Sequence, residues 1–467
     1  MDSKASAFKS FELNHSLFDL RIDDVPVWER LRFQVYKQIK RQYGTGKAHT
    51  DVDRGYREYL GGVKLFTKNL FIKNPYFTGE SDILYFGHSR RKKGEDGHWR
   101  DIYCDPIHNA CDHEYVHFEE PYLLNHLSPA QTSNLRYLDL IKYGSHIQRI
   151  LGINDIKMTT ESRTILTDIE DELLDVFDVE VDLLSMTKEA LHSRRTILPL
   201  YRRLLKHVDP KLVVLTVSYD RETFIEACKQ QNIPVVELQH GVIYPNHLGY
   251  AYPGPRSKET FPDYLLTFGE FWTDVVEFPI PDDHIIPVGY PYLEQSADKY
   301  DHVETKDQLL FISQGAIGEQ LSKFAVAVDQ HPDINHEIVY KLHPGEYDRW
   351  QAEYPWLVDV DFNVIDQSEP ELYRLFAESQ GQIGVYSTAV YEGLQFGLET
   401  YLYECPGEEI LQPLINNGTA TLIRSADQLA SALATHTGQI DSQQYFAPNA
   451  TSRMCEIIST LTTRQTD

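Results

Sequence analysis

Short apolar runs alternate with amphipathic helical stretches from about residue 80 onward, and this alternation constrains the fold more than any other feature. Residues 212–217, 234–238 and 382–386 are typical strand-forming runs, and a helical pattern follows each of them. Because parallel strands need a crossover connection, usually a helix, this alternation predicts parallel βαβ units. The pattern is interrupted by a polar stretch at 290–306, which we interpret as a linker, and then restarts. The chain therefore predicts two successive α/β units.

A length of 467 residues exceeds what one ordinary core supports, which also favours several domains. The predicted fold class is α/β, with two Rossmann-like doubly wound domains facing each other across a cleft. Ligands usually bind in such a cleft. The predicted division is a helical N-terminal arm, an N-terminal Rossmann-like domain, a C-terminal Rossmann-like domain, and a closing helix with a tail: 1–78, 79–292, 305–437 and 438–467.

The chain is strongly acidic, with 70 Asp and Glu against 44 Lys and Arg and a formal net charge of −26. Nucleic-acid binding depends on neutralising phosphates, so this charge predicts that nucleic acid is not a partner. Two explanations of the charge stay open. One is adaptation to high salt, which screens an acidic surface, and the other is an ordinary acidic protein.

Five cysteines without paired spacing predict free thiols in a reducing compartment. The first residues have no apolar segment of a secretory signal, and no apolar run reaches membrane-spanning length. We therefore expect a cytoplasmic protein. Peripheral contact with the inner face of the cell membrane stays open.

Cysteines and histidines gather between residues 104 and 113. Cys104, His108, Cys111 and His113 resemble a metal cluster in residue type, but their spacing fits no zinc pattern. The sequence therefore favours a structural role for them and leaves metal binding open. The predicted functional site contains no metal.

A Lys-Leu-His-Pro segment at 341–344 follows a strand-like run. Pro344 disfavours helical backbone at His343, so we expect extended backbone that brings the imidazole to the sheet edge. There His343 and Lys341 can hold a diphosphate or stabilise it as it leaves. A helix start expected near Glu346 would also attract anions. The alternative is a histidine that caps the strand through backbone contacts. The α/β edge rule favours the phosphate role.

Two hydroxyl residues stand where another apolar run passes into a predicted helix at 388–396. Ser387 is a natural N-cap, and the helix start at Thr388 would leave N–H groups for a phosphate. Glu392, about one turn further on, could accept hydrogen bonds from ribose hydroxyls. An ordinary cap with a surface glutamate is the alternative.

Ser313 and Gly315 end the first predicted strand of the C-terminal domain. A glycine there lets the backbone approach a phosphate or a base. Both residues are predicted to contact a nucleotide.

A Gln-His-Gly segment at 239–241 follows the run at 234–238. Gly241 permits a turn that other residues resist. A histidine at such a turn is suited to act as general base toward an acceptor hydroxyl, which is the role predicted for His240. A buried histidine bridging loop carbonyls is the alternative.

Basic residues are concentrated in one loop of the N-terminal domain, where Arg90 and Arg91 follow His88. They predict recognition of an acidic or phosphorylated acceptor, and a solvated loop is the alternative. The helical stretch 188–206 also carries arginines. For it we expect inward-packed leucines and solvated arginines rather than membrane contact.

Together these segments resemble the GT-B glycosyltransferases, and within them the capsule-polysaccharide, sialyltransferase-like and CDP-glycerol glycerophosphotransferase-like groups. The resemblance spans about residues 80–435. The 239–241 segment resembles the His-Gly loop of the glycerophosphotransferases, in which the histidine is the base. The 341–344 segment resembles a His-Pro motif that contacts nucleotide phosphate.

Ser387 and Thr388, with Glu392, resemble the Ser/Thr-rich helix start and acidic ribose contact of these families. Two departures are visible. The first loop reads Gln-His-Gly rather than Trp-His-Gly, and no acidic motif of the polysialyltransferase kind is found near the acceptor side.

The resemblance implies a metal-independent glycosyltransferase without a cofactor. It would move a sugar from a nucleotide-activated donor to a glycan or lipid-linked acceptor in cell-surface polysaccharide or glycoprotein glycan biosynthesis. The N-terminal domain would bind the acceptor and the C-terminal domain the donor. The expected residues are His240 and His343 for catalysis; Ser313, Gly315, Lys341, His343, Ser387, Thr388 and Glu392 for the donor; and His88, Arg90 and Arg91 for the acceptor.

Two other activities fit the same scaffold. One is transfer of glycerol phosphate from CDP-glycerol. The other is a nucleotide-sugar 2-epimerase, which needs no acceptor.

Overall fold

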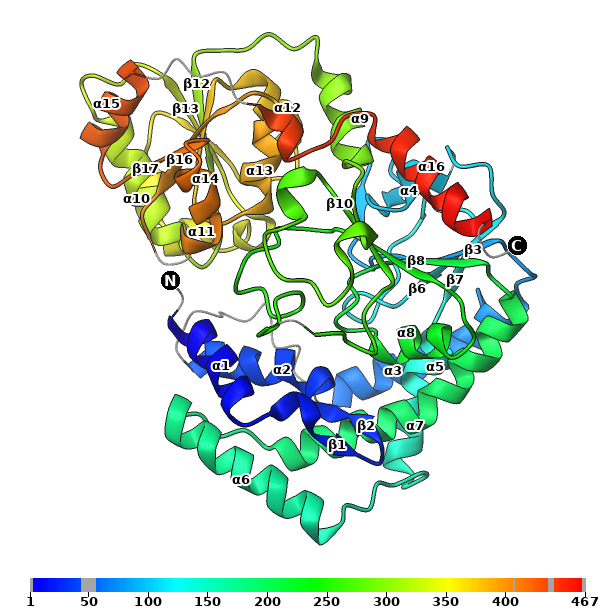
Figure 1. The fold of residues 1–467 in the computed structure, drawn as a ribbon. Coiled ribbons are helices and arrows are strands. Elements are labelled where there is room, and N and C mark those ends of the chain that lie inside the picture. Colours follow the sequence, from blue (N-terminus) through cyan, green and yellow to red (C-terminus); the bar gives the residue numbers. More distant parts are fainter. Residues whose placement is uncertain are drawn as a thin grey trace.

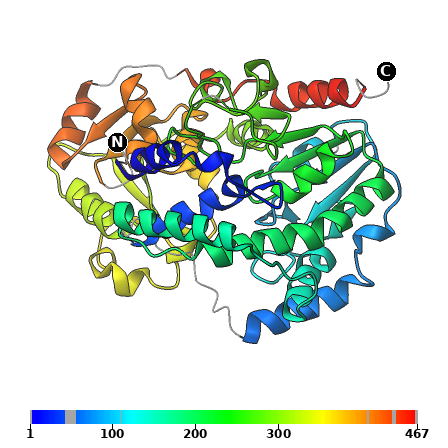
Figure 2. The same cartoon turned by 60° about the horizontal axis from the view of Figure 1, so that its bottom comes forward.

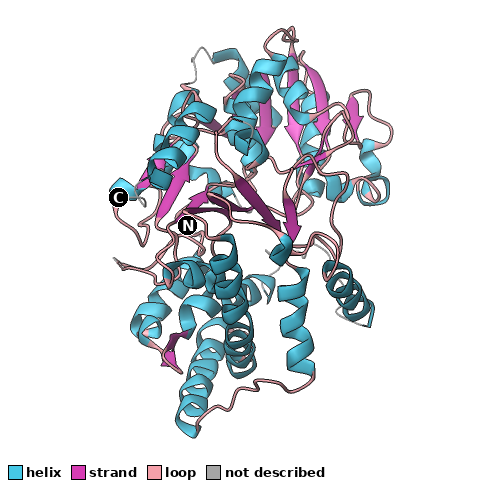
Figure 3. Ribbon diagram, turned by 90° about the vertical axis from the view of Figure 1, so that its right-hand side faces the viewer, coloured by secondary structure: helices cyan, strands magenta, loops and turns pink. Residues whose placement is uncertain are grey.

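The structure is a computed structural model that describes residues 3–42, 56–108, 110–254, 256–405, 408–435 and 441–463. Two sheets, each covered by helices, form separate layers, and a helical arm lies at one end of the molecule (Figures 1 and 3). This confirms the predicted architecture of two Rossmann-like domains, the GT-B arrangement.

Seven strands of the described residues build the N-terminal sheet: β3 (Ile83–Phe86), β6 (Tyr115–Glu119), β7 (Leu135–Tyr137), β8 (Leu212–Thr216), β9 (Val235–Leu238), β10 (Tyr264–Thr267) and β11 (Ile285–Pro287). All neighbours are parallel, in the order β7-β6-β3-β8-β9-β10-β11. Counted along the chain, this is the Rossmann order 3-2-1-4-5-6 with one strand added. The strand order reverses between β3 and β8.

The C-terminal sheet repeats this order with six described strands: β12 (Gln308–Ile312), β13 (Glu337–Lys341), β14 (Asn363–Ile365), β15 (Gly381–Gly384), β16 (Glu399–Tyr403) and β17 (Ala420–Ile423). They lie parallel in the order β14-β13-β12-β15-β16-β17. Its reversal point lies between β12 and β15. Ligands of open α/β sheets bind outside the carboxyl ends of the strands at such points.

The helices of the N-terminal domain are α4 (Asp105–His108), α5 (Asp139–Ile150), α6 (Thr160–Phe177), α7 (Leu183–Val208) and α8 (Glu222–Lys229). Those of the C-terminal domain are α10 (Gly318–Asp329), α11 (Trp350–Glu353), α12 (Leu372–Glu378), α13 (Thr388–Leu394), α14 (Gln412–Asn416) and α15 (Ala426–Thr435). The strands are buried almost throughout, because helices cover both sheet faces.

The N-terminal arm consists of α1 (Ser3–Asn14), α2 (Val27–Gln42) and α3 (Tyr56–Asn69), with a short hairpin of β1 (Arg21–Ile22) and β2 (Val25–Pro26). Apolar residues of α1 and α2 share a core with α6 and α7. The long helices α6 and α7 cross one face of the molecule (Figure 2). A buried ion pair joins α1 to α2, with Arg32 Nε 2.7 Å from Glu12 Oε1. Removing one partner of a buried pair typically costs about 3–5 kcal/mol, so this pair fixes the arm.

The helix α7 confirms the expected packing, since its leucines are buried. Arg194 on its outer face pairs with Glu226 of α8. No helix among the described residues is long and apolar enough to span a bilayer.

The predicted linker at 290–306 is largely helical, because α9 (Pro291–Tyr300) occupies most of it. Four of its residues, Pro291, Leu293, Ser296 and Tyr300, are buried. The polar composition that suggested a linker belongs to the exposed face of this helix. The predicted closing helix is α16 (Ala450–Thr463), which returns to the N-terminal domain (Figure 1). There Met454, Ile458 and Leu461 pack against β3 and β8.

The prediction of five free thiols is wrong for two of them, because Cys111 and Cys455 form a disulfide. It joins the segment after α4 to α16 across 344 residues of sequence. Spacing could not reveal a pair so distant in the chain. Cys104, Cys228 and Cys405 are buried and lie outside any disulfide.

Candidate active site at the interdomain junction

The predicted donor residues follow three adjacent strands of the C-terminal sheet. β12 lies between β13 and β15, so Ser313, His343 and Ser387 are all near the carboxyl edge. The strand order reverses between β12 and β15, so these residues lie beside the reversal point. The prediction that these distant segments share one edge is confirmed.

The carboxyl edges of the two domains meet. A methyl group built on Gly241, in the turn after β9, would lie 3.5 Å from the hydroxyl oxygen of Thr388 at the start of α13. Behind this contact, the rings of Trp272 and Tyr391 lie 4.7 Å apart in a shared apolar core. Nearer the solvent, Lys92 pairs with Glu371 at 2.5 Å. The junction therefore places the His240 loop opposite the donor residues.

His240 is held by two tyrosines and an acid. The Tyr250 hydroxyl donates to Glu237 Oε1 at 2.7 Å and lies 3.3 Å from His240 Nδ1. Because its proton is committed to Glu237, the Tyr250 oxygen accepts from His240 Nδ1–H. The Tyr219 hydroxyl lies 3.2 Å from Nε2 and can donate to it. This network favours the tautomer with a lone pair on Nε2, the form that a general base needs.

Burial lowers the pKa of His240 well below its usual value, and the neighbouring His88, His247 and Arg221 lower it further. The His88 ring lies 6.4 Å from the His240 ring, centroid to centroid. The Tyr103 hydroxyl donates to the His240 carbonyl at 2.7 Å. His240 is therefore neutral at physiological pH and fixed through both its backbone and its ring.

The structure also shows how His343 is held. Its backbone is extended (φ −68°, ψ 142°), as Pro344 predicted. Its Nδ1 accepts the Gly345 N–H at 3.0 Å, which places the proton of the neutral ring on Nε2. The expected helix start near Glu346 is wrong, because Pro344–Glu346 is only one 3₁₀ turn. A single turn offers no helix N-terminus for an anion.

Glu346 is a buried positioning residue. Its carboxylate accepts from the His343 backbone N–H at 2.7 Å, from the Ser313 hydroxyl at 3.1 Å and from Tyr354 at 2.8 Å. It thereby ties the ends of β12 and β13 together. Ser313 also accepts from Tyr340 and is only 3% exposed. We therefore correct the role of Ser313 from donor contact to positioning, since its hydroxyl is already used.

A contact of Gly315 with a nucleotide stays a prediction, and the group that lies close to this glycine in the structure belongs to the protein itself. A methyl group built on Gly315 would lie 2.8 Å from Arg349 Nη2. Arg349 also donates to the Gly345 carbonyl at 2.9 Å and pairs with Glu353 at 2.7 Å. This half-exposed guanidinium is a cation at the donor edge that sequence reasoning missed.

Lys341 already makes a hydrogen bond within its own domain. Its ammonium donates to the Gln367 carbonyl beyond β14. Burial lowers its pKa to about 8, against the opposing effect of Glu369 and Asp366. A phosphate contact by Lys341 stays a prediction and would require this hydrogen bond to break.

Ser387 is the predicted N-cap, and its hydroxyl accepts the Ala389 N–H at 3.2 Å. The helix that it caps is shorter than the predicted 388–396, because α13 ends at Leu394. Seven residues carry a small dipole, and the cap already occupies one free N–H group. Thr388 therefore contributes chiefly its hydroxyl at the junction.

Glu392 is half-buried at the junction. Burial raises its pKa to about 7, and the opposing effects of Lys92 and of a hydrogen bond from Tyr373 are smaller. Its charge in turn raises the pKa of Tyr103 in the other domain. The carboxyl thus lies between the domains and changes charge near neutral pH.

The basic loop divides into different environments. Arg91 is fully buried, paired with Glu119 and hydrogen-bonded to Thr132. Its predicted acceptor contact is therefore corrected to a structural role. His88 lies beside His240, and Arg90 is exposed. Both stay candidates for acceptor binding.

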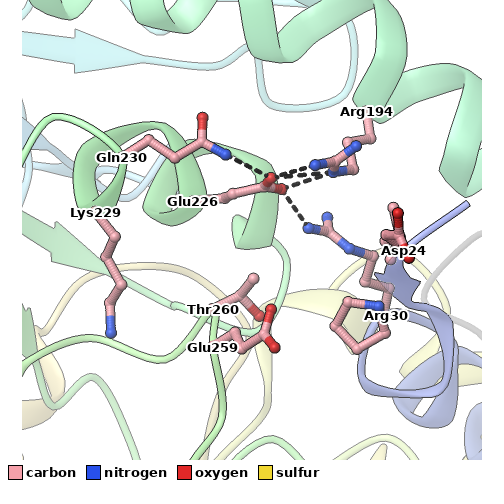
Figure 4. Close-up of a pocket in the computed structure, with 10 residues that line it drawn as sticks. Asp24, Arg30, Arg194, Glu226, Lys229, Gln230, Glu259 and Thr260 are labelled. Atoms are coloured by element: carbon pink, nitrogen blue, oxygen red, sulfur yellow. Dashed lines mark hydrogen bonds and ion pairs between the residues drawn. The ribbon is translucent and has the colours of Figure 1, made fainter. Parts of the chain in front are cut away.

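Two well-formed cavities of the described residues lie away from this junction. One, of about 270 Å³, lies between the arm, α7 and α8. There Arg30 and Arg194 both pair with Glu226, so both guanidinium groups already have a carboxylate partner (Figure 4). The other, of about 450 Å³, lies at the amino end of β6. Neither has converging groups suited to the predicted chemistry.

Several positioning residues were missed by sequence reasoning. Glu237 carried a signal, because an acid within an apolar strand must have buried partners. Glu346 contacts His343 locally, three residues further along the chain. Tyr250 and Arg349 carried no signal, since only the fold brings them to the site.

No protein-family model and no curated protein matches this sequence. Among solved structures, the UDP-GlcNAc 2-epimerase of Methanocaldococcus jannaschii is similar at 12% identity and a TM-score of 0.47, covering 82% of this chain and 99% of that one. MurG of Acinetobacter baumannii has 12% identity and a TM-score of 0.44, covering 81% and 99%. The wall teichoic acid polymerase TagF has 10% identity and a TM-score of 0.41, covering 88% and 100%. Likenesses this weak do not identify an activity. The fold assignment rests on the strand orders.

Proposed function

We propose that this protein is a glycosyltransferase of the GT-B type that transfers a sugar from a nucleotide-activated donor to a glycan or lipid-linked acceptor. The observation that carries the proposal is the meeting of two carboxyl edges, where Gly241 lies against Thr388. One edge bears a histidine oriented as a base, and the other bears hydroxyl, imidazole and guanidinium groups suited to phosphate.

In the proposed reaction, His240 Nε2 removes the proton of an acceptor hydroxyl. The hydroxyl oxygen then bonds to the anomeric carbon as the bond from that carbon to the phosphate oxygen breaks. The departing nucleotide phosphate keeps the electron pair. Donors pre-positioned near such a developing charge stabilise the transition state, and His343 Nε2–H and Arg349 are suited to this role. We propose that no metal or cofactor takes part in the transfer, because the Arg349 guanidinium supplies positive charge and the neutral His343 ring supplies an N–H donor.

We further propose that the acceptor belongs to a cell-surface polysaccharide or glycan and that the protein works at the inner face of the cell membrane. Phe71 is 80% exposed and Ile72 is 49% exposed at the end of α3, beside the exposed Lys64 and Lys68. Apolar and basic side chains together suit an anionic lipid surface. Co-sedimentation with anionic vesicles should be weaker for Phe71→Ser than for the wild-type protein. Equal binding by the variant would contradict the proposed membrane contact.

Product analysis tests the activity. The wild-type protein is incubated with nucleotide sugars or CDP-glycerol, with and without glycan and lipid-linked acceptors. A glycosylated acceptor with release of nucleotide supports the proposal. Transfer of glycerol phosphate identifies the glycerophosphotransferase instead, and conversion of UDP-N-acetylglucosamine without acceptor identifies a 2-epimerase.

His240→Gln separates catalysis from binding. A general base typically contributes about 10²–10⁴-fold to the rate, so turnover should fall by that order while nucleotide binding is retained. His113→Gln, on the far side of the N-terminal domain, is the matched control.

A further inference from the structure

A buried cluster of mixed donors lies behind the His88 loop. A carboxylate oxygen of Asp101, the sulfur of Cys104 and a ring nitrogen of His117 all lie within 4.8 Å of one another. Each of the three residues is 0% exposed. Asp101 and Cys104 come from the loop after β5 (Trp99–Arg100), and His117 comes from β6.

The Asp101 carboxylate is held in place by the backbone around it. Oδ1 accepts the N–H groups of Tyr103 at 3.0 Å and Cys104 at 3.1 Å, and Oδ2 accepts that of His88 at 2.8 Å. A methyl group on Gly87 would fall 2.2 Å from both Asp101 Oδ2 and His117 Nε2. Only a glycine therefore leaves the space beside these two atoms clear.

His117 points a nitrogen without a hydrogen-bond partner into this cluster. Its Nε2 is buried and lies 3.6 Å from Asp101 Oδ2, too far for a hydrogen bond. On its other side, Nδ1 lies 3.5 Å from His108 Nε2, and His108 Nδ1 lies 3.2 Å from Asp105 Oδ1. Asp101, His117, His108 and Asp105 therefore form a row, with a carboxylate at each end.

His117 Nε2 and His108 Nδ1 are both buried without a hydrogen-bond partner, although each lies near a carboxylate. In the neutral tautomer that carries its proton on Nδ1, His117 turns the Nε2 lone pair toward the Asp101 carboxylate. A cation at that position would satisfy both groups and would also bind the Cys104 sulfur.

We propose that Asp101, Cys104 and His117 bind a Zn²⁺ ion whose fourth ligand is a water molecule. Thiolate, imidazole and carboxylate are the three ligand types of zinc sites, and a thiolate favours zinc over magnesium or calcium. Binding converts the Cys104 thiol to thiolate and releases one proton to solvent. Of the cysteines and histidines at 104–113, only Cys104 belongs to this set. Cys111 is in the disulfide, and the third ligand, His117, comes from the next strand.

The ion would stiffen one wall of the candidate active site. Asp101 holds the His88 backbone N–H, and the His88 ring faces His240. The ion would position the His88 loop and take no part in the transfer, so zinc binding can be tested without an assay of transfer.

The test uses the full-length protein with its disulfide intact. Metal analysis after purification should find one zinc per chain. Replacement by Co²⁺ should give the absorption of a tetrahedral site with a thiolate-to-cobalt charge-transfer band. Both should be lost in Cys104→Ser and His117→Gln and kept in Cys228→Ser, which alters another buried free cysteine.

Zinc retained in both ligand variants, or a cobalt spectrum without the thiolate band, would overturn the proposal. Circular dichroism checks that the variants are folded. If they are not, the wild-type cobalt spectrum decides alone, and absence of a bound metal from the wild-type protein refutes the site. None of these outcomes depends on the proposed transferase activity.

Discussion

At the scale of single residues, the account depends on how His240 is oriented. The Glu237–Tyr250–His240 contacts select the tautomer, and Tyr219 faces the atom that would act as the base. The sequence predicted the histidine itself, because a His-Gly turn after a strand is a local pattern. Its orienting tyrosines could not be predicted, since they follow other segments of the chain.

Removal of the Tyr250 hydroxyl should therefore slow catalysis. In Tyr250→Phe the His240 Nδ1–H loses its acceptor, and we expect kcat to fall by about 10–100-fold with little change in KM. Steady-state kinetics check this, with Tyr264→Phe as a control at a tyrosine that packs on His284. Equal losses in both variants would contradict the orienting role.

Glu392 should make stability depend on pH. Its pKa is about 7 in the folded protein against an ordinary value of 4.5, so the folded state holds the proton where the unfolded state has lost it. The free energy of unfolding should fall as pH rises from about 4.5 to 7 and then level off. Glu392→Gln should remove this pH-dependent change in the free energy of unfolding, which is on the order of 1–3 kcal/mol. Urea titrations of both proteins at pH 5 and pH 8 measure it, and parallel pH profiles would rule it out.

At the scale of elements, the buried central strands and the edge strand β11 were predictable, whereas the other three edge strands of the described sheets were not. The apolar runs of β3, β8, β9, β12 and β13 matched the sequence pattern closely. β7, β14 and β17 were missed because they are three or four residues long and lie at or near sheet edges. α9 was taken for a linker because half of its surface is polar.

The disulfide should hold α16 on the N-terminal domain. Peptide mapping without reductant should recover Cys111 linked to Cys455, and Cys455→Ser should lower the melting temperature. Loss of a native disulfide typically costs about 2–5 kcal/mol. Cys405→Ser, at a buried cysteine outside the disulfide, is the control. Two unlinked cysteines under oxidising conditions would contradict the assignment.

Glu346 should couple two strand ends to the donor site. Glu346→Gln keeps the shape but weakens the bonds from His343, Ser313 and Tyr354. We expect a stability loss of about 1–3 kcal/mol and weaker nucleotide binding. Calorimetry and isothermal titration check both, and Glu337→Gln, at an exposed residue at the amino end of β13, is the control. Unchanged nucleotide affinity in Glu346→Gln would contradict a role of Glu346 in shaping the donor site.

At the scale of the whole molecule, two sheets that share the strand order 3-2-1-4-5-6 bring the His240 loop and the donor segments to one junction. Repetition of strand–helix units made the domain count and the sheet edge predictable from local patterns. The helical arm was predictable as an element, but its contact with the site was not. Arg32 of α2 reaches the Ala251 carbonyl at 3.2 Å, and Phe33 packs on Tyr219. These contacts are set by tertiary packing alone.

The central claim is that the carboxyl edge of the C-terminal sheet binds the anionic part of a nucleotide-activated donor. Thermal denaturation with CMP, CDP, UDP and GDP tests it most directly, since a ligand of the folded state raises the melting temperature. We predict stabilisation of the wild-type protein by one of these nucleotides. In His343→Ala, which should stay folded but lose turnover, that gain should disappear. A nucleotide that stabilises the variant as strongly as the wild type, or wild-type turnover by the variant, would contradict the claim.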